Sequence, residues 1–235
     1  MPHAQPSGPP PPAHPPRVAA RFPAPLRVAA VLAVGFLIVT TCTLLGWTQS
    51  LDRQVLQTLR RAIPELTPGE SHLSIELMRD ATALGGIGLV ATASVLLIVY
   101  LALRRAWRSI GQVVLVVGGA QASVSLLKLL IARPRPNLVD HGAQVITYSY
   151  PSGHATLAAA VALSLAWAGA ARHRRLTLKV YFWVLGLMML LLLGFSRMYL
   201  GVHWVSDVAG GLLLGSIFAC LGAALNQRAR RSARA

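Results

Sequence analysis

Acidic residues are scarce in this chain: Asp and Glu together number seven among 235 residues, against 22 Lys and Arg. All charged residues make up only 12% of the sequence, while hydrophobic residues make up 54% and the mean hydropathy is +0.57. Soluble globular domains rarely reach such a composition, so it predicts an integral membrane protein. The few carboxylates form no cluster in the sequence that would bind Mg²⁺ or Zn²⁺, and we predict no metal site.

Two further features exclude other classes. Cysteine is limited to Cys42 and Cys220, both inside apolar runs, where each is most simply a small hydrophobic residue. Two such cysteines supply neither a disulfide framework nor a metal-binding pattern. The formal net charge of +15 does not indicate a nucleic-acid partner, because the basic residues lie between apolar runs rather than on a dense soluble face.

Six apolar stretches dominate what is present, and each is near the roughly 20 residues that a helix needs to cross about 30 Å of hydrocarbon. We therefore predict an all-α integral membrane protein with six transmembrane helices in a domain over residues 26–225. Six crossings put both termini on one side. The stretches are Leu26–Trp47, Ala81–Leu103, Ile110–Ile131, His154–Ala171, Leu178–Phe195 and Val205–Leu225.

The two ends of the chain differ from this domain. Residues 1–25 hold ten of the fifteen prolines and almost no large apolar side chains, so we predict a disordered tail there. Residues 226–235 are predicted to form a short basic tail. Arginines precede the first apolar stretch, as in a signal peptide. The stretch is long, however, and no clear small-residue cleavage site precedes a soluble domain, which favours an uncleaved first helix.

Lys and Arg are distributed unevenly between the two predicted faces. Fourteen of the 22 lie in the N-terminal tail or after the second, fourth and sixth stretches. Because loops rich in Lys and Arg stay in the cytoplasm, we predict that both termini are cytoplasmic, in a cell inner or plasma membrane. The opposite face, periplasmic or extracellular, carries the remaining loops. The fourteen residues are Arg17, Arg21, Arg27, Arg104, Arg105, Arg108, Arg172, Arg174, Arg175, Lys179, Arg228, Arg230, Arg231 and Arg234.

The segment between the first two stretches has apolar residues at helical spacing, interrupted by Pro64 and Pro68. It predicts a pair of short outer helices that lie at the membrane interface. An ordinary amphipathic connector that covers helix ends is the alternative, and we assign the segment no chemistry. Gly211 and Gly215, four residues apart in the sixth stretch, are predicted to mark a close approach between helix backbones.

Lys128 lies near the outer end of the third stretch and is followed by Arg133-Pro134-Arg135-Pro136. The prolines end the helix, so the chain turns into a loop that is predicted to hold two guanidinium groups next to Lys128. Such a group either anchors a helix end at the membrane or binds an anion. Positive charge is favoured on the cytoplasmic side, so a cation cluster on the outer face is unusual.

Pro151-Ser152-Gly153-His154 comes immediately before the fourth stretch and therefore lies at a helix N-terminus. Unpaired backbone N–H groups and the helix dipole attract anions there, and Gly153 lets a ligand approach the backbone closely. The alternative is a plain helix cap, with Ser152 as the capping residue and His154 as an interfacial side chain.

Ser196-Arg197 ends the fifth stretch, and His203 and Asp207 lie four residues apart at the start of the sixth. Residues at i and i+4 share one helix face, so the carboxylate can accept the proton of one imidazole nitrogen and leave the other nitrogen as a nucleophile. The alternative is that Asp207 only complements the helix dipole. In the six-helix topology this motif and the two preceding ones fall on the same outer face.

Together the three motifs resemble the signature of the type 2 phosphatidic acid phosphatase and vanadium haloperoxidase superfamily, which is Lys-x6-Arg-Pro, Pro-Ser-Gly-His and Ser-Arg-x5-His-x3-Asp. The resemblance covers most of the six stretches and implies a metal-independent lipid phosphate phosphatase that needs no cofactor. It implies that His203 attacks phosphorus to form a phosphohistidine, that Asp207 orients His203, and that His154 protonates the leaving group. The residues implied to bind the phosphoryl oxygens are Lys128, Arg135, Ser152, Gly153 and Arg197.

The implied substrate has a phosphorylated head group and a lipid tail, of the undecaprenyl diphosphate, phosphatidic acid or phosphatidylglycerophosphate type. Two alternatives share the motifs. A haloperoxidase would use the cations to hold vanadate, but those members are soluble and six membrane spans count against that activity. A catalytically silent protein that binds or transports lipid phosphates would keep the pocket without turnover, and the presence of both histidines and of Asp207 disfavours it. The sequence leaves the oligomeric state open.

Overall fold

The computed structural model describes residues 24–61, 73–136 and 147–232, and these residues form helices and connecting segments without any strand. One short stretch, η1, is π-helical and joins two α-helices into one rod. The elements are α1 (Ala24–Leu44), α2 (Gln49–Arg61), α3 (Leu73–Ala83), α4 (Ile87–Leu103), α5 (Trp107–Val113), η1 (Val114–Gly119), α6 (Ala120–Ile131), α7 (Gly153–Ala170), α8 (Leu176–Tyr199) and α9 (Val205–Ser232).

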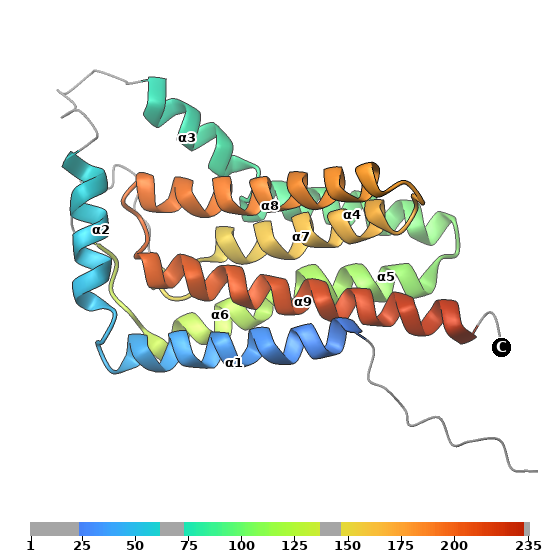
Figure 1. Ribbon diagram of the computed structural model, residues 1–235, viewed down its shortest axis with the longest axis horizontal. Coiled ribbons are helices and arrows are strands. Elements are labelled where there is room, and N and C mark those ends of the chain that lie inside the picture. The colour runs from blue at the N-terminus through green and yellow to red at the C-terminus, as the bar shows by residue number, and fades with distance from the viewer. Residues whose placement is uncertain (1–23, 62–72, 137–146, 233–235) are drawn as a thin grey trace, which may run out of the picture.

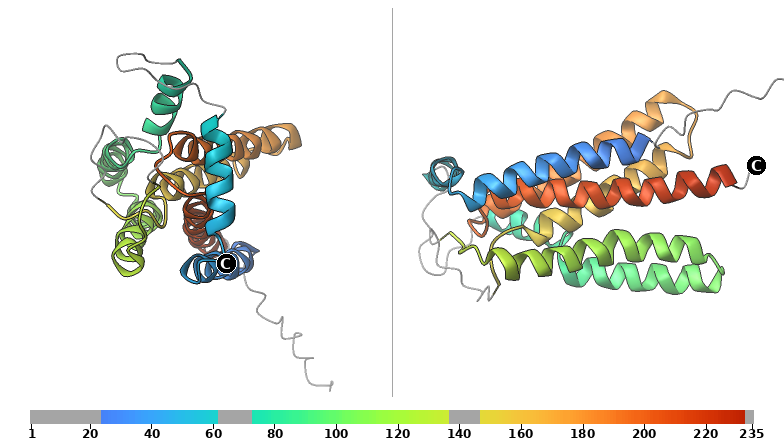
Figure 2. Two further views of the ribbon diagram at one scale, coloured as in Figure 1. Left: turned by 90° about the vertical axis from the view of Figure 1, so that its left-hand side faces the viewer. Right: turned by 90° about the horizontal axis from the view of Figure 1, so that it is seen from below.

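Six helical segments are long and apolar enough to cross a membrane, and the predicted fold class is confirmed. Their long axes run along the bundle, and α2 lies across one end of it (Figure 1). The α4–α5 and α7–α8 connections lie at the opposite end, as do the start of α1 and the end of α9 (Figures 1 and 2). The segments are Ala24–Leu44, Leu73–Leu103, Trp107–Ile131, Gly153–Ala170, Leu176–Tyr199 and Val205–Gln227.

The core of the bundle lies where α7 packs against α8 and α9, with α1 along the other side of α9. The glycines of α9 allow this packing. A Cβ added at Gly211 would lie 2.6 Å from the carbonyl oxygen of Ser152, and one added at Gly215 would overlap the carbonyl oxygen of Thr156. The predicted close approach of helix backbones is therefore confirmed, and the approach is between α9 and α7.

The outer helices expose large apolar side chains. In α4, only Val90 is buried, whereas Leu96 has 66% of its surface exposed and Leu103 has 81%. A soluble protein would bury such residues, but in a bilayer the lipid tails solvate them. This distribution is that of a multi-pass membrane protein.

The segment between the first two spans differs in part from the prediction. α2 is a separate short helix, but α3 leads through Gly85 and Gly86 directly into α4, and the two together form the second candidate span. The apolar run that begins at Ala81 continues across the break, so the last residues of α3 and the whole of α4 lie in one apolar stretch. Pro64 and Pro68 lie outside the described residues.

The predicted tails are described only in part. Residues 1–23 of the expected disordered tail lie outside the described residues, and α1 begins at Ala24. At the other end, α9 continues through Ser232, so most of the expected basic tail over residues 226–235 extends the last helix. The sequence there is rich in Ala and Arg, which favour a helix.

Candidate active site

The N-termini of α7 and α9 are joined by their backbones. The N–H of Ser152 donates to the carbonyl oxygen of Asp207 at 3.0 Å. The hydroxyl of Ser152 caps α7 by accepting a hydrogen bond from the N–H of Ala155 at 3.5 Å, and the carboxylate of Asp207 accepts one from the N–H of Trp204 at 2.9 Å. Each helix start is thus satisfied locally, and His154 and His203 come to the same end of the bundle.

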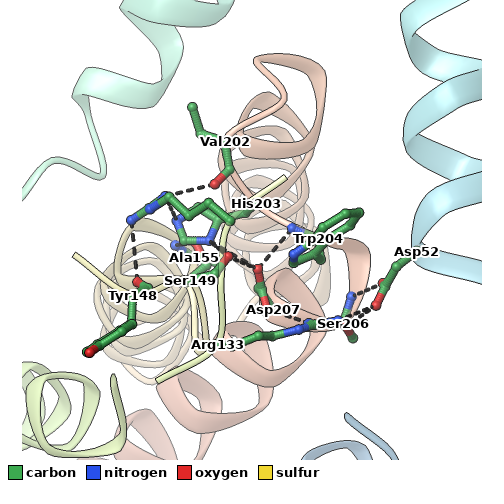
Figure 3. Close-up of polar contacts among 12 residues, drawn as sticks. Asp52, Arg133, Tyr148, Ser149, Ala155, Val202, His203, Trp204, Ser206 and Asp207 are labelled. Carbon is green, nitrogen blue, oxygen red and sulfur yellow. Dashed lines mark hydrogen bonds and ion pairs between the residues drawn. The ribbon is translucent and has the colours of Figure 1, made fainter. Parts of the chain in front are cut away.

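His203 and Asp207 form a buried pair, with 2% and 0% of their side-chain surface exposed (Figure 3). The His203 Nδ1 lies 3.4 Å from the Asp207 Oδ2, and Ser149 donates its hydroxyl hydrogen to the same oxygen. Burial lowers the pKa of His203 to about 4, although the hydrogen bond and charge of Asp207 oppose this. The imidazole is therefore neutral near pH 7. With the proton on Nδ1, facing Asp207, the lone pair is on Nε2.

Arg135 lies on the Nε2 side of His203. Its Nη1 is 3.3 Å from Nε2 and donates to the carbonyl oxygen of Val202 at 2.7 Å, and its Nε donates to the carbonyl oxygen of Thr147 at 2.8 Å. Burial lowers the pKa of Arg135, opposed by the charge of Asp207, but a guanidinium stays protonated at neutral pH. A fixed positive charge therefore lies beside the nitrogen that carries the lone pair.

Lys128 reaches the same place from the last turn of α6. Its ammonium donates to the carbonyl oxygen of Tyr148, the residue whose carbonyl also accepts from Nη2 of Arg135 at 3.5 Å. The main chain at residues 147–148 thus holds both cations. Lys128 and Arg135 therefore lie close together, as predicted.

Arg197 approaches from the last turn of α8. Its Nη1 donates to the hydroxyl of Thr82 at 3.2 Å, while its Nε is buried and meets no acceptor among the residues that the structure describes. A buried donor without an acceptor is costly and needs an explanation, because most such groups are paired in folded proteins.

His154 lies in the first turn of α7 and is partly buried. It interacts electrostatically with Lys128, Arg135 and Arg197 and with His203, so side chains from four places in the sequence lie within electrostatic range of this imidazole. A Cβ added at Gly86 would lie 3.8 Å from its Nε2, which places the glycine break between α3 and α4 beside the imidazole.

One predicted detail is wrong. Only one of the two guanidinium groups expected beside Lys128 lies there: Arg133 turns away and pairs with Asp52 and Asp207 at 2.7 and 2.6 Å. Ser152 is fully buried and its hydroxyl caps α7, which is the capping alternative stated for it. A contact of Ser152 or of the Gly153 amide with phosphate stays a prediction.

Sequence reasoning missed four residues of this network, namely Asp52, Arg133 as an ion-pair partner, Ser149 and Ser206. The scarcity of acidic residues in the sequence could have indicated the role of Asp52. Asp52 is one of only seven, and a carboxylate on the buried side of an amphipathic helix needs a partner. Within the described residues, no three His, Cys, Asp or Glu side chains gather as they would around a metal ion.

Comparison with known families identifies the chain. A model of the PAP2 superfamily matches residues 109–231, which is more than half of the sequence. The chain belongs to the PAP2 superfamily. The matched range holds all three motifs of this PAP2 protein, and Asp52 and Thr82 lie before it.

Curated PAP2 relatives match parts of the chain. The chain is similar to an undecaprenyl-diphosphatase of Sulfolobus acidocaldarius, 44% identical over 69 residues, which cover 29% of each chain. It is also similar to phosphatidylglycerophosphatase B of Bacillus subtilis, 29% identical over 134 residues, which cover 54% of this chain and 63% of the relative. These matches span less than two thirds of the relatives' length.

A solved structure matches more of the PAP2 protein. The crystal structure of a transmembrane PAP2 type phosphatidylglycerolphosphate phosphatase from Bacillus subtilis superimposes with a TM-score of 0.72 at 26% identity. The match covers 85% of this chain and 96% of the other. The arrangement of helices that brings the motifs together is therefore shared with a PAP2 phosphatase.

Proposed function

We propose that this PAP2 protein is a membrane-embedded lipid phosphate phosphatase that acts through a phosphohistidine on His203. The observation that carries the proposal is that the two nitrogens of the His203 ring face groups of opposite charge. Nδ1 of His203 faces the carboxylate of Asp207 at 3.4 Å, and Nε2 faces the guanidinium of Arg135 at 3.3 Å. A neutral ring with its proton fixed on one side and a cation on the other is arranged to attack an anionic phosphoryl group.

In the first step, the lone pair of Nε2 of His203 forms a bond to phosphorus, and the bond from phosphorus to the lipid oxygen breaks. His154 donates a proton to that oxygen, so the lipid leaves as a neutral alcohol from a monoester, or as a lipid phosphate from a diphosphate. Asp207 stabilises the imidazolium character that His203 acquires as the bond forms.

In the second step, water attacks the phosphohistidine. His154, now without its proton, accepts one from the water, and the bond between phosphorus and Nε2 breaks. Inorganic phosphate leaves, and both imidazoles return to their starting protonation. The same residue thus serves as acid and then as base, as microscopic reversibility requires.

Three cations are available for the charge of the transferring group. Lys128, Arg135 and Arg197 interact electrostatically with His154, and Arg135 and Arg197 also interact with His203. Positively charged donors of this kind stabilise a phosphoryl transition state. Arg197 supports the proposal further, because its buried Nε has no acceptor among the described residues and a phosphoryl oxygen would supply one. The proposed reaction needs no metal or other cofactor.

The proposed substrate is a lipid with a phosphomonoester or diphosphate head group. The names of the relatives support undecaprenyl diphosphate and phosphatidylglycerophosphate as candidates, and phosphatidic acid presents the same phosphomonoester. Substrates of this kind stay in the bilayer, and the site lies at one end of a bundle whose outer helices are apolar.

We propose that the site faces the periplasm or the extracellular space, in a cell inner or plasma membrane, with both termini cytoplasmic. The support is the distribution of arginines. Arg104 and Arg105 follow α4 and Arg174 and Arg175 precede α8, at the end of the bundle opposite to α2 (Figure 1). Basic loops are retained on the cytoplasmic side.

The test is release of inorganic phosphate by the purified protein in mixed micelles with EDTA present. Polyprenyl diphosphate, phosphatidate and phosphatidylglycerophosphate are compared at equal surface concentration, with the His203→Ala variant as the blank. Release by the wild-type protein that is lost in the variant supports the proposal. If the intact protein binds these lipids but releases phosphate from none of them, it is instead a lipid phosphate binding or transport protein.

A further inference from the structure

Arg133 lies between two buried carboxylates that come from distant parts of the chain. Its Nη2 is 2.7 Å from the Oδ2 of Asp52, and its Nη1 is 2.6 Å from the Oδ1 of Asp207 (Figure 3). The exposed fraction is 11% for Arg133, 1% for Asp52 and 0% for Asp207. Charges this deeply buried are costly unless they are paired, so the three side chains form one unit.

Asp52 is held on its other side by the first turn of α9. The N–H of Ser206 donates to its Oδ1 at 2.9 Å, and the hydroxyl of Ser206 donates to its Oδ2 at 2.6 Å. The Nη1 of Arg133 also donates to that hydroxyl, at 2.7 Å. The helix α2, which lies across the end of the bundle, is thereby tied to the residue next to Asp207.

The two oxygens of Asp207 have separate partners. Arg133 binds Oδ1, whereas Oδ2 accepts from the N–H of Trp204 and the hydroxyl of Ser149 and faces Nδ1 of His203. Arg133 itself is fixed, with its guanidinium 5.6 Å from the centre of the Trp204 ring. Because a guanidinium has a rigid planar fork, its position determines the orientation of the carboxylate that faces the imidazole.

Charge balance gives Asp52 a second role. A lone Arg133 against Asp207 would offset the negative charge that stabilises the imidazolium of His203. With Asp52 on the other side, the three groups carry a net charge of one negative unit. The carboxylate of Asp207 thus keeps its effect on the ring although an arginine is bound to it.

We propose that Asp52 and Arg133 are positioning residues for the reaction: they orient the carboxylate of Asp207 and maintain its charge toward His203. Neither contacts the ring or the side chains assigned to the phosphoryl group in any described interaction, so they act through Asp207. The inference rests on the proposed function, in which His203 is the nucleophile, and it gives α2 a part in catalysis.

The pH profile tests this charge effect. His203 is faced by Asp207 on α9, by Arg135 after α6, by Arg197 on α8 and by His154 on α7. None of these changes in the variants. Asp52→Asn removes a negative charge, which destabilises the imidazolium, so the acid limb of kcat/KM is expected to move to lower pH. Arg133→Gln removes a positive charge and is expected to move it to higher pH. Each shift is expected to be roughly 0.5–1 pH unit, as for one charge acting through a partly screened site.

The size of the rate effect tests the positioning. We expect both variants to lower kcat by about 10–100-fold, as outer partners of catalytic groups do, with KM changed less than about twofold. Arg133→Lys keeps the charge but loses the fork, so kcat is expected to fall while the acid limb stays in place. The double variant Asp52→Asn with Arg133→Gln is expected to return the acid limb toward that of the wild type.

Exposed residues on α2 and α3 provide matched controls, Arg53→Gln and Glu76→Gln, and we expect wild-type kinetics from both.

The proposal is overturned if the two single variants shift the limb in the same direction, leave it in place, or raise KM with kcat unchanged. Should Asp52→Asn fail to fold, Arg133→Gln against Arg133→Lys decides the matter by itself, because only the first changes charge. Phosphate release by the wild type and its loss in His203→Ala are measured first. An inactive wild type contradicts the proposed function, whereas an active wild type with unaffected Asp52 and Arg133 variants contradicts only this inference.

Discussion

The backbone N–H of Ser152 donates to the carbonyl oxygen of Asp207 at 3.0 Å, and this bond joins the starts of α7 and α9. His154 follows Ser152 by two residues, and His203 precedes Asp207 by four. One main-chain hydrogen bond therefore links the segments that carry both imidazoles. This bond fixes the two backbones relative to each other, which suits the proposed reaction, in which both imidazoles act at one phosphorus.

Asp207→Asn is expected to lower kcat by about 10³–10⁴-fold, because an amide can hold the wrong tautomer of His203 and cannot stabilise its imidazolium. The measurement is phosphate release under saturating lipid. Glu76→Gln is the control, since it makes the same chemical change on the exposed face of α3. Equal rates for Asp207→Asn and the wild type would contradict the assigned role.

Arg197→Lys is expected to lower kcat/KM by about 10²-fold, since one preorganised donor to a transition state is worth that much and a lysine lacks the Nε–H and the planar fork. Arg172→Lys serves as the control, as Arg172 is exposed and follows α7 at the far end of the bundle. The prediction fails if the two variants have the same kcat/KM.

The pH dependence of kcat/KM follows from the state of His203. Burial lowers its pKa to about 4, and in the proposed mechanism only the neutral ring attacks. We therefore expect kcat/KM to be independent of this residue at neutral pH and to halve near pH 4. Enzyme incubated at low pH and assayed at pH 7 distinguishes this titration from inactivation. An acid limb at the ordinary imidazole pKa of about 6.5 would show that the ring is solvated rather than buried.

Gly215→Ala is expected to destabilise the protein by about 1–3 kcal/mol, because the added Cβ overlaps the carbonyl oxygen of Thr156 and forces α7 and α9 apart. Loss of activity should accompany it, since the same two helices carry the imidazoles. Gly88→Ala is the matched control on α4, where a Cβ meets nothing within 4 Å. There the change is expected to be neutral or to stabilise by up to about 1 kcal/mol. Thermal unfolding in detergent measures both, and an equal effect of the two substitutions would rule out the steric explanation.

A reporter fused after Arg234 is expected to behave as a cytoplasmic protein, because the basic loops lie at the end of the bundle opposite to the site. A second reporter, inserted in the segment between α2 and α3, is expected to behave as an external one. If the two signals are exchanged, the proposed site faces the cytoplasm and the orientation is wrong, while the chemistry is unaffected.

The sequence was sufficient to predict the six spans and the convergence of the motif residues. A span is a local property of about 20 apolar residues, and connectivity then determines which helix ends share a face. The pairing of Arg133 with Asp52 could not be predicted from the apolar stretches and the connectivity. It joins residues 81 positions apart and depends on where α2 crosses the bundle. Ser149 belongs to no motif and was missed for the same reason. The prediction that Arg133 lies beside Lys128 is wrong. Successive residues of a loop have no fixed face, so the sequence does not show which of the two arginines points toward Lys128.

Lys128 and Arg135 both donate to main-chain oxygens of the segment at residues 147–148. A peptide carbonyl group is a dipole without net charge. It therefore holds each cation in position by a hydrogen bond without neutralising its positive charge. In the proposed reaction, a phosphorylated head group would therefore meet two cations that are already held in position, and it would compete for them only with neutral acceptors.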